Sequence, residues 1–460
     1  MKNWFKKNKI IVVLFFLILI PRFIFMLVAF FVLGDSGFVG GCDVYLPAGL
    51  NLLIHHTFTN FSSNLPLVPN SFPAPGYPIL LGISWLIIPK YLFIVFWQNI
   101  MYALFIVFVY KFSRLFFNNT VSMMAAVFMA FEPFSFFWSN MVMSETPFLL
   151  FFMLSIYFLA LSWRNQKLKY IIFSAIFLGL AALIRQIAFL FFPAIIAMTT
   201  IMFWRKVSLY KLAKLLIIFL LVFLAITAPW CIRNKIQFGN YTISNQTHLL
   251  YFLATTRSFL SLTTDLSIDE ADKYLKNLAV EKAGAGNFNE ISIVDKYIPI
   301  FKEISFSIIK DNPFSYLKWH LIKALPVLTD SGWMNILYFW HVDLSGDRSV
   351  NISNLLVQGD LQTLSYSLKN NQVFLVRILG IVFWLLIDAI AFFGIFLMIR
   401  KKEFLRIGLV MLIIIGYFFI TSSWVAMARL RLPLQPFLFI FAAYAIYDFY
   451  LKLTIKNETR

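Results

Sequence analysis

Long apolar segments separated by short charged stretches make up most of this 460-residue chain. A helix of roughly 20 apolar residues crosses a bilayer core, and about ten segments approach that length. These segments span residues 10–33, 91–110, 120–138, 147–163, 170–184, 187–204, 211–232, 373–399, 405–423 and 433–451. Residues 77–89 are also apolar, but this stretch is too short to cross. The pattern predicts an all-α polytopic membrane protein.

The charged residues support this topology. They make up only 13% of the chain, about half the share that is usual in soluble domains, which argues against an ordinary water-soluble protein. The net charge is +18, yet Lys and Arg follow alternate apolar segments and are absent from the short loops 34–89 and 139–146. Because Lys and Arg gather on the cytoplasmic side, we expect a multi-pass protein of the cytoplasmic (inner) membrane with a cytoplasmic N-terminus. The charge therefore reflects topology, and no nucleic-acid partner is expected.

Three parts are expected along the chain. Residues 1–232 form an N-terminal transmembrane core with a first outward loop at 34–90, residues 233–372 form an outward-facing region, and residues 373–460 form the C-terminal transmembrane helices. In the outward region, apolar residues recur at helical spacing around two lysines in NPFSYLKWHLIKALPVL. This spacing predicts an amphipathic helix on the membrane surface, in contact with lipid.

Acidic residues at the outer ends of the apolar segments are candidates for chemistry, because a carboxylate at a membrane boundary is costly. Partial burial also raises its pKa, which suits a general base. Asp43 lies in GGCDVYLPAGL, and Glu145 opens a segment in SNMVMSETPFLL. For Glu145 a structural interpretation is equally open, because Ser144 followed by an acid is typical of a helix N-terminus. Asp35 is either a candidate or a solvated turn residue, and Glu132 is expected to cap or pack.

Arginines form a complementary set at the outer ends, where the positive-inside rule does not place them. These residues are Arg185, Arg233, Arg429 and Arg431. A guanidinium near the head-group layer can bind a phosphate through two parallel hydrogen bonds, and several together favour a phosphorylated lipid as ligand. The alternative for each one alone is a side chain that extends to the phosphates of ordinary lipids.

Motifs for other chemistries are absent from the sequence. It contains no Walker loop, no GxGxxG after a strand, no GxSxG elbow and no HExxH, so nucleotide-handling and zinc-protease chemistry are not indicated. The two cysteines, Cys42 and Cys231, exclude a disulfide scaffold and a cysteine-rich metal site. Both are expected near the outer face, but their spacing does not show whether they pair.

The order of several motifs resembles the C-type glycosyltransferases of family 39, which include protein O-mannosyltransferase-like and aminoarabinose-transferase-like enzymes. The first motif is an Asp-x-Tyr in the first outward loop, formed by Asp43 and Tyr45. The others are PAPGYPILLGISWL, which contains Tyr77, then SETPFLLFF, LGLAALIRQIAFLFFP, APWCIRNKIQFGNYTISNQ and ARLRLPLQPFLFIFAAYAI. The resemblance covers about residues 10–240 and 425–447.

The resemblance implies a transferase that moves a sugar from a polyprenyl-phosphate donor to a lipid, glycan or protein acceptor. Transfer is expected on the outer face of the membrane, with inversion at the anomeric carbon. Asp43 corresponds to the base or acceptor-orienting group, Glu145 to a second acid and Arg185 to a ligand of the lipid phosphate. The other expected substrate-binding positions are Tyr45, Tyr77, Arg233, Asn234, Arg429 and Arg431. Many relatives have an Asp-Glu pair where this chain has Asp43-Val44, so it stays open whether Asp35 supplies the missing catalytic acid.

No cofactor is required by the sequence. A divalent metal such as Mg²⁺ or Mn²⁺ that bridges Asp43, Glu145 and a phosphate is compatible with these residues, but nothing demands it. Two other functions remain open. A flippase or other transporter of lipid-linked oligosaccharides should show paired halves with broken helices. A ligase or polymerase of surface polysaccharide should use basic and His residues of the outward region, which are here His248, His320 and His341.

Overall fold

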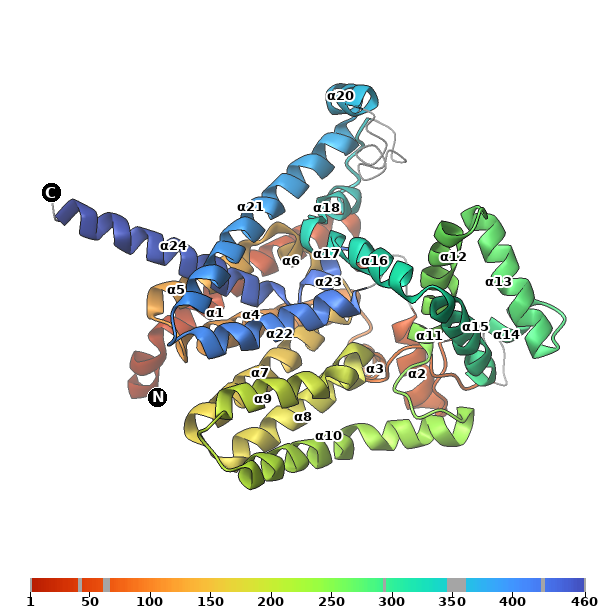
Figure 1. Cartoon of the computed structure of the whole chain (residues 1–460), viewed down its shortest axis with the longest axis horizontal. Helices are drawn as coiled ribbons and strands as arrows, with labels where there is room; N and C mark the ends of the chain where they lie inside the picture. The colour runs from red at the N-terminus through yellow and green to blue at the C-terminus, as the bar shows by residue number, and fades with distance from the viewer. Residues whose placement is uncertain are drawn as a thin grey trace. The chain divides into compact units, whose positions relative to one another are not determined.

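The structure is a computed structural model that describes residues 2–39, 44–60, 67–292, 295–345, 361–422 and 427–458. These residues form helices and connecting turns, and no β-strand occurs among them (Figure 1). The expectation of an all-α protein is therefore confirmed. Whether Cys42 pairs with Cys231 stays open, because Cys42 lies outside the described residues.

Seven helical segments in the described part are long and apolar enough to cross a membrane. They are α1 (Lys2–Leu33), α4 (Tyr91–Arg114), α7 (Glu145–Asn165), η2 (Gln186–Phe191) with α9 (Phe192–Phe203), α10 (Leu209–Phe238), α21 (Gln372–Arg400) and α24 (Gln435–Glu458). The shorter apolar helices are α3 (Gly76–Ile87), α5 (Asn119–Phe131), α8 (Leu168–Ile184) and α22 (Leu405–Thr421). Each apolar segment found in the sequence overlaps one of these helices, and 120–138 is divided between two α-helices. The protein is a multi-pass membrane protein.

One predicted segment, 120–138, is interrupted in the structure. α5 ends, and α6 (Pro133–Trp138) begins a new helix, because a proline lacks the N–H that a continuous helix requires. Glu132 caps this new helix: its carboxylate accepts hydrogen bonds from the backbone N–H of Phe134 at 3.1 Å and of Ser135 at 2.7 Å. The expected capping role of Glu132 is confirmed.

The chain forms two compact units that are interleaved in sequence. The first unit comprises Met1–Phe108, Met141–Ala324 and Ile420–Val425. The second unit comprises Val109–Asn140, Leu325–Phe419 and Ala426–Arg460. Two helices, α4 and α22, pass through a boundary and contribute residues to both units.

In the first unit, α2 (Tyr45–His55) crosses α3 at very short range. A Cβ atom on Gly49 would lie 2.0 Å from the carbonyl oxygen of Pro78, and one on Gly82 would lie 2.9 Å from the carbonyl carbon of Gly49. Only glycine permits such an approach of two backbones. The crossing brings Tyr45 and Tyr77 into an edge-to-face contact with ring centroids 5.1 Å apart.

Helices α7 and α8 of the same unit form a hairpin, and α8 also packs against α10 (Figure 1). The turn between α7 and α8 begins at Gln166, which adopts a left-handed conformation. Ser155 and Ser174 face each other across the hairpin, and each hydroxyl donates to the other residue's carbonyl oxygen at 2.9 Å. Small polar residues of this kind hold membrane helices together. The start of α7 and the end of α8 therefore lie at the same end of the hairpin.

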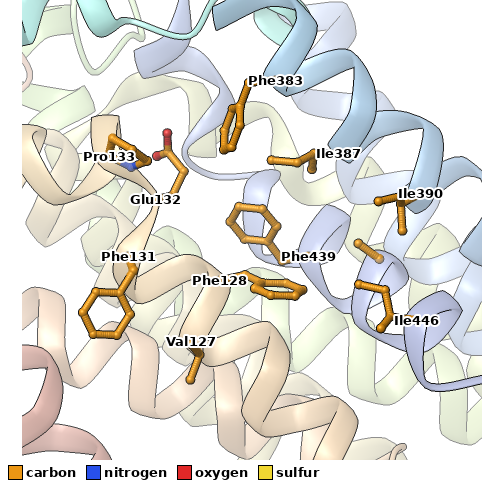
Figure 2. Close-up of a pocket in the computed structure, with 11 residues that line it drawn as sticks. Val127, Phe128, Phe131, Glu132, Pro133, Phe383, Ile387, Ile390, Phe439 and Ile446 are labelled. Atoms are coloured by element: carbon orange, nitrogen blue, oxygen red, sulfur yellow. The ribbon is translucent and has the colours of Figure 1, made fainter. Parts of the chain in front are cut away.

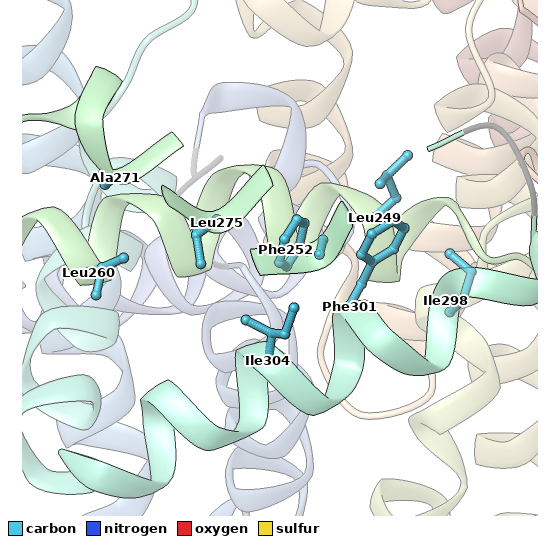
Figure 3. Close-up of a cluster of buried hydrophobic side chains, with 9 residues drawn as sticks. Leu249, Phe252, Leu260, Ala271, Leu275, Ile298, Phe301 and Ile304 are labelled. Atoms are coloured by element: carbon cyan, nitrogen blue, oxygen red, sulfur yellow. The ribbon is translucent and has the colours of Figure 1, made fainter. Parts of the chain in front are cut away.

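The middle of the chain adds a group of short helices with a hydrophobic core of its own to the first unit (Figure 3). These are α11 (Gln246–Leu250), a π-helical turn η3 (Tyr251–Thr256), α12 (Arg257–Thr263), α13 (Ile268–Ala283), α14 (Phe288–Ser292), η4 (Asp295–Tyr297), α15 (Ile298–Asp311) and α16 (Pro313–Ala324). Phe252 and Phe301 stack at the centre with ring centroids 4.8 Å apart. On α16, Phe314, Leu317 and Leu321 are exposed, and the contact of this helix with the membrane surface stays a prediction.

The close crossing of α2 and α3 gives a first prediction. Gly49→Ala places a methyl group against the Pro78 carbonyl, and we expect this overpacking to lower the free energy of unfolding by about 1–3 kcal/mol. Gly416→Ala is the matched control, because a Cβ at Gly416 of α22 has no atom within 4 Å. Thermal unfolding of both variants in detergent checks this. Equal stability of the two variants would contradict the close crossing.

His248 gives a prediction about pH. Burial, with the nearby Lys302, lowers its pKa from 6.5 to about 4. Between these values the unfolded chain binds a proton that the folded protein does not bind, so stability present above pH 6.5 is lost as the pH falls. We expect the α11–α16 region to lose about 1 kcal/mol at pH 5 relative to pH 7.5, after allowance for solvent screening. Pulse proteolysis with fragment mapping measures this loss, which His248→Gln should abolish. An equal pH response in this variant would contradict the prediction.

Candidate functional site

The predicted base, Asp43, lies outside the described residues, and its role stays a prediction. The described elements on its two sides are η1 (Asp35–Phe38) and α2, which begins at Tyr45. The carboxylate of Asp35 accepts hydrogen bonds from the backbone N–H groups of Tyr91 at 3.0 Å and Leu92 at 2.8 Å. Both of its oxygens therefore cap the start of α4. This geometry gives Asp35 a structural task, while a catalytic role for it stays a prediction.

Glu145 and Arg185 form an ion pair at one end of the α7–α8 hairpin. Glu145 is the first residue of α7 and is buried, and Arg185 directly follows α8. Nη1 of Arg185 lies 2.6 Å from Oε1 of Glu145, and it also donates to the hydroxyl of Ser144 at 3.3 Å. Two of the predicted site residues, 40 positions apart, are thus brought together. The guanidinium contacts a protein carboxylate. An arginine that only extends to the phosphates of ordinary lipids would not need this contact.

Arg185 keeps hydrogen-bonding capacity beyond this pair. Its side chain is 23% exposed, and the described residues make no hydrogen bond with its Nε or Nη2. Burial alone would lower the pKa of Arg185, but Glu145 and Tyr45 raise it, and the net change is upward. A permanently charged guanidinium with accessible N–H groups is suited to bind an anion. Tyr45, also a predicted site residue, is close enough to influence that charge.

Tyr77 is fully buried and begins a chain of hydrogen bonds that leads to the segment before Glu145. Its hydroxyl donates to Oε1 of Gln98 at 2.7 Å, and Nε2 of Gln98 donates to the carbonyl oxygen of Met141, also at 2.7 Å. The next residue, Val142, donates its N–H to the carbonyl oxygen of Phe38 at 3.0 Å. Tyr77 therefore connects α3, through Gln98, to the segment that precedes Glu145.

Gln98 is a residue that the sequence analysis missed. It is one of two adjacent buried amides, with Asn99, in a mostly apolar helix, and polar residues inside membrane helices usually have a specific partner. The position of this amide in an apolar segment could be read from the sequence. Its partners, Tyr77 and Met141, could not.

Arg233 and Asn234 lie near the end of α10 and are engaged with backbone groups. Nη1 of Arg233 donates to the carbonyl oxygen of Asn70 at 2.9 Å and to Oδ1 of Asn234 at 2.7 Å. The guanidinium also lies 4.8 Å from the ring centroid of Trp230. Nδ2 of Asn234 donates to the carbonyl oxygen of Thr242 at 2.7 Å. These contacts fasten two loops to α10, and a role in substrate binding stays a prediction.

Arg431 belongs to the second unit and is completely buried there. Its Nη1 donates to the carbonyl oxygens of Val327, Leu328 and Asp330 at 3.1, 3.3 and 2.6 Å. Its guanidinium carbon lies 3.4 Å from the ring centroid of Trp384, and burial lowers its pKa to about 10. This geometry uses Arg431 to hold the end of α17 (Pro326–Thr329), so a direct contact with a lipid phosphate gains no support from it.

Arg429 lies on the same short helix, α23 (Ala428–Arg431), and differs from Arg431. It is half-buried, and the described residues form no hydrogen bond or ion pair with it. The carboxylate of Asp330 accepts the N–H of Ala428 at 2.9 Å and that of Gly332 at 3.0 Å. Asp330 and Arg431 therefore fix the short helix that presents Arg429. Neither Asp330 nor Trp384 was singled out in the sequence.

The structure bears on the predicted metal site through Glu145. Among the described residues, no group of three His, Cys, Asp or Glu side chains is placed to hold a metal ion. Glu145, the described member of the predicted bridge, is already paired with Arg185. Metal dependence stays an open prediction.

Known proteins resemble this chain in sequence and in fold. Residues 73–232 match the family model of dolichyl-phosphate-mannose-protein mannosyltransferases. This range contains Tyr77, Gln98, Glu145 and Arg185. The resemblance is confirmed. A sequence search among curated proteins finds no match.

Solved structures show the C-type glycosyltransferase fold. The crystal structure of the Archaeoglobus fulgidus oligosaccharyltransferase tethered with an acceptor peptide matches with a TM-score of 0.52 at 16% identity, over 100% of this chain and 51% of that chain. The same enzyme in complex with an inhibitory peptide and a dolichol-phosphate matches with a TM-score of 0.51 at 15% identity, over 99% and 52%. Its complex with Zn and sulfate gives a TM-score of 0.50 at 15% identity, over 95% and 50%. This chain thus spans about half the length of the solved structures it matches.

The ion pair at the hairpin end predicts strong coupling between its two members. Arg185→Met leaves the Glu145 carboxylate buried without its cation, and we expect a loss of about 3 kcal/mol in stability. The double variant Glu145→Gln/Arg185→Met should recover most of that loss, because it removes both charges. Denaturant unfolding of the purified protein in detergent measures the coupling. Additive effects of the single substitutions would contradict it.

Proposed function

We propose that this protein is a membrane glycosyltransferase. It transfers a sugar from a polyprenyl-phosphate-linked donor to a hydroxyl group of a lipid, glycan or protein acceptor, with inversion at the anomeric carbon. The observation that carries this proposal is the Glu145–Arg185 pair, in which Nε and Nη2 of Arg185 make no hydrogen bond with the described residues. A phosphate is a natural ligand for these N–H groups. The family match over residues 73–232 is independent support.

The reaction assigns a separate task to each of the main residues. Asp43 accepts the proton of the acceptor hydroxyl as its oxygen forms a bond to the anomeric carbon. The bond between that carbon and the phosphate oxygen breaks, and polyprenyl phosphate leaves with the bonding electrons. Arg185 stabilises the charge that develops on the leaving phosphate, and Glu145 orients Arg185. Phosphate is a good leaving group, so no covalent intermediate is required.

The remaining predicted residues are assigned to substrate contacts or to their support. We propose that Tyr45 lies beside the anion bound by Arg185. Tyr77 is proposed to position, through Gln98, the segment that precedes Glu145. Arg429 is proposed to bind an anionic part of the substrate, and Arg431 acts through the short helix that carries Arg429. Arg233 and Asn234 are proposed to order the loops between which substrates enter.

The relatives bear on the substrates of the proposal. The Archaeoglobus enzyme was solved with a dolichol-phosphate and with an acceptor peptide, which supports a polyprenyl-phosphate donor and keeps a protein acceptor among the three classes. It was also solved with Zn and sulfate. A divalent metal beside Asp43 and Glu145 would supply further charge for the phosphate, and the steps above do not depend on it.

We propose the cytoplasmic membrane as the location, with a cytoplasmic N-terminus and the site on the outer face. Residues 1–232 then form the catalytic transmembrane core, 233–372 an outward-facing region and 373–460 the closing transmembrane helices. The basic residues at alternate helix ends support this orientation.

The alternative functions gain no specific support. A polysaccharide ligase would need accessible histidines, but His248 is partly buried beside Lys302. His320 contacts the Tyr316 hydroxyl at 3.2 Å and the carbonyl oxygen of Ile420 at 2.7 Å. For a flippase, the charged residues of the first unit would have to line a path between the two faces, whereas Glu145 and Arg185 lie together at one end of a hairpin.

Transfer and binding assays with purified protein in detergent test the proposal. The assays use radiolabelled polyprenyl-phosphate sugars for transfer and unglycosylated polyprenyl phosphate for binding. Asp43→Asn should lower transfer by about 10²–10⁴-fold and leave binding of polyprenyl phosphate unchanged. Arg185→Ala should weaken that binding by about tenfold or more, because a charge-assisted hydrogen bond contributes about 1.5–3 kcal/mol. Asp265→Asn, an exposed acid of the outward region, is the control and should behave as wild type.

Two results would overturn this assignment. Asp43→Asn with wild-type transfer would remove Asp43 as the base. Arg185→Ala with unchanged affinity for polyprenyl phosphate would remove the phosphate site from the hairpin end.

A further inference from the structure

The second unit contains an apolar groove that the proposed reaction does not use. Helix α24 forms its floor, because it packs against both α5 and α21. α5 and α21 make little contact with each other, which leaves a gap above α24. Side chains from the three helices surround this gap, as Figure 2 shows. The groove has a volume of about 440 Å³, which is within the range of small-molecule sites.

The lining of the groove follows helical spacing on each element. Phe439, Ala442 and Ile446 form one stripe on α24, with the small Ala442 in the centre of the floor. One wall consists of Val127, Phe128 and Phe131 from α5, and the other consists of Phe383, Ile387 and Ile390 from α21. Phe131 and Ile390 are 48% and 39% exposed. The groove is therefore open along its side, between helices that are apolar enough to lie in a membrane.

Only one end of the groove is polar. Glu132 and Pro133 close it where α5 gives way to α6 (Figure 2). The Glu132 carboxylate accepts hydrogen bonds from two backbone N–H groups and from Nε2 of Gln435 at 3.1 Å. No Lys or Arg is among the residues that line the groove, so the groove itself offers no cation to a phosphate.

An apolar groove of this size needs an apolar occupant. If the groove were empty, its lining side chains would lack dispersion contacts on one side. Water would find too few hydrogen-bond partners to occupy an apolar site. In a membrane, the surrounding solvent is hydrocarbon. The most abundant molecules that can enter are bilayer lipids, and abundance fills even a weak site.

We propose that this groove binds one acyl chain of a bilayer phospholipid. The acyl chain lies on the Ala442 stripe between the walls of α5 and α21, and the phosphate head group stays away from Glu132. A polyprenyl phosphate is the less suitable ligand, because the groove has no cation for its phosphate. This proposal is independent of the glycosyltransferase reaction, since it concerns neither Asp43 nor Arg185.

Photolabelling of the full-length protein tests the proposal. The protein is reconstituted in vesicles that contain a phosphatidylglycerol with a diazirine in its acyl chain, irradiated, and analysed by peptide mass spectrometry. We expect label on peptides of α5, α21 and α24 that line the groove. Ala442→Phe fills the floor and should abolish this label, while Leu386→Phe, which adds a similar ring at a 62% exposed position of α21, should retain it.

A second variant and a second probe make the outcome decisive. Val127→Trp fills the groove from a half-exposed wall position, so it gives the same test if Ala442→Phe does not fold. A parallel sample contains a diazirine-bearing polyprenyl phosphate at the same mole fraction. Stronger groove labelling by the polyprenyl probe would overturn the acyl-chain assignment. Absence of label from the groove, or label that persists in the filled variants, would overturn the site itself.

Discussion

The ion pair between Glu145 and Arg185 is the interaction on which the candidate site depends. A charge close to a bilayer is costly when it stands alone, and the cost falls when an opposite charge and hydrogen bonds compensate it. The pair holds the start of α7 against the end of α8. The end of α8 also lies against the start of α3, since a Cβ on Gly76 would lie 3.0 Å from the carbonyl oxygen of Leu183. The pair therefore organises three helices around one cation.

Further polar groups extend this organisation to the segment that follows α1. The amide of Gln98 links Tyr77 to Met141, and Asp35 caps α4 across 56 positions of sequence. Each of these contacts satisfies a backbone or side-chain group that water could not reach in apolar surroundings. The contacts that satisfy these polar groups also position the segments on both sides of the predicted catalytic loop. Tyr77 and Gln98 are uncharged, so the net charge of the chain gives no information about their contacts.

Much of the fold followed from hydrophobic pattern, and the reasons for the exceptions are specific. The membrane helices could be located because their length is set by the bilayer. The break at Glu132 could have been read from Pro133, but the apolar residues on both sides hid it. Glu145 and Arg185 could be selected one by one from their positions at helix ends. Their direct contact could not, because it depends on how two helices pair.

The remaining differences also arise from tertiary contacts. Arg431 and Arg429 look equivalent in ARLRLPLQPF, yet Arg431 is engaged with three carbonyl groups and Arg429 has no partner among the described residues. Which of two neighbouring arginines is buried depends on α17 and Trp384, about 100 and 47 positions earlier in the chain. The groove over α24 depends in the same way on α5 and α21, whose lining residues are more than 200 positions apart. No local pattern contains that information.

The hairpin geometry of α7 and α8 also has a consequence for how the chain enters the membrane. Its two charged ends, Glu145 and Arg185, lie opposite to the turn at Gln166, so in the proposed orientation both must cross the bilayer when the hairpin inserts. Separately, each crossing would carry an uncompensated charge. As a preformed hairpin, held by Ser155 and Ser174, the two helices carry a neutral pair across together. In the proposed orientation, the same ion pair therefore favours insertion of α7 and α8 together.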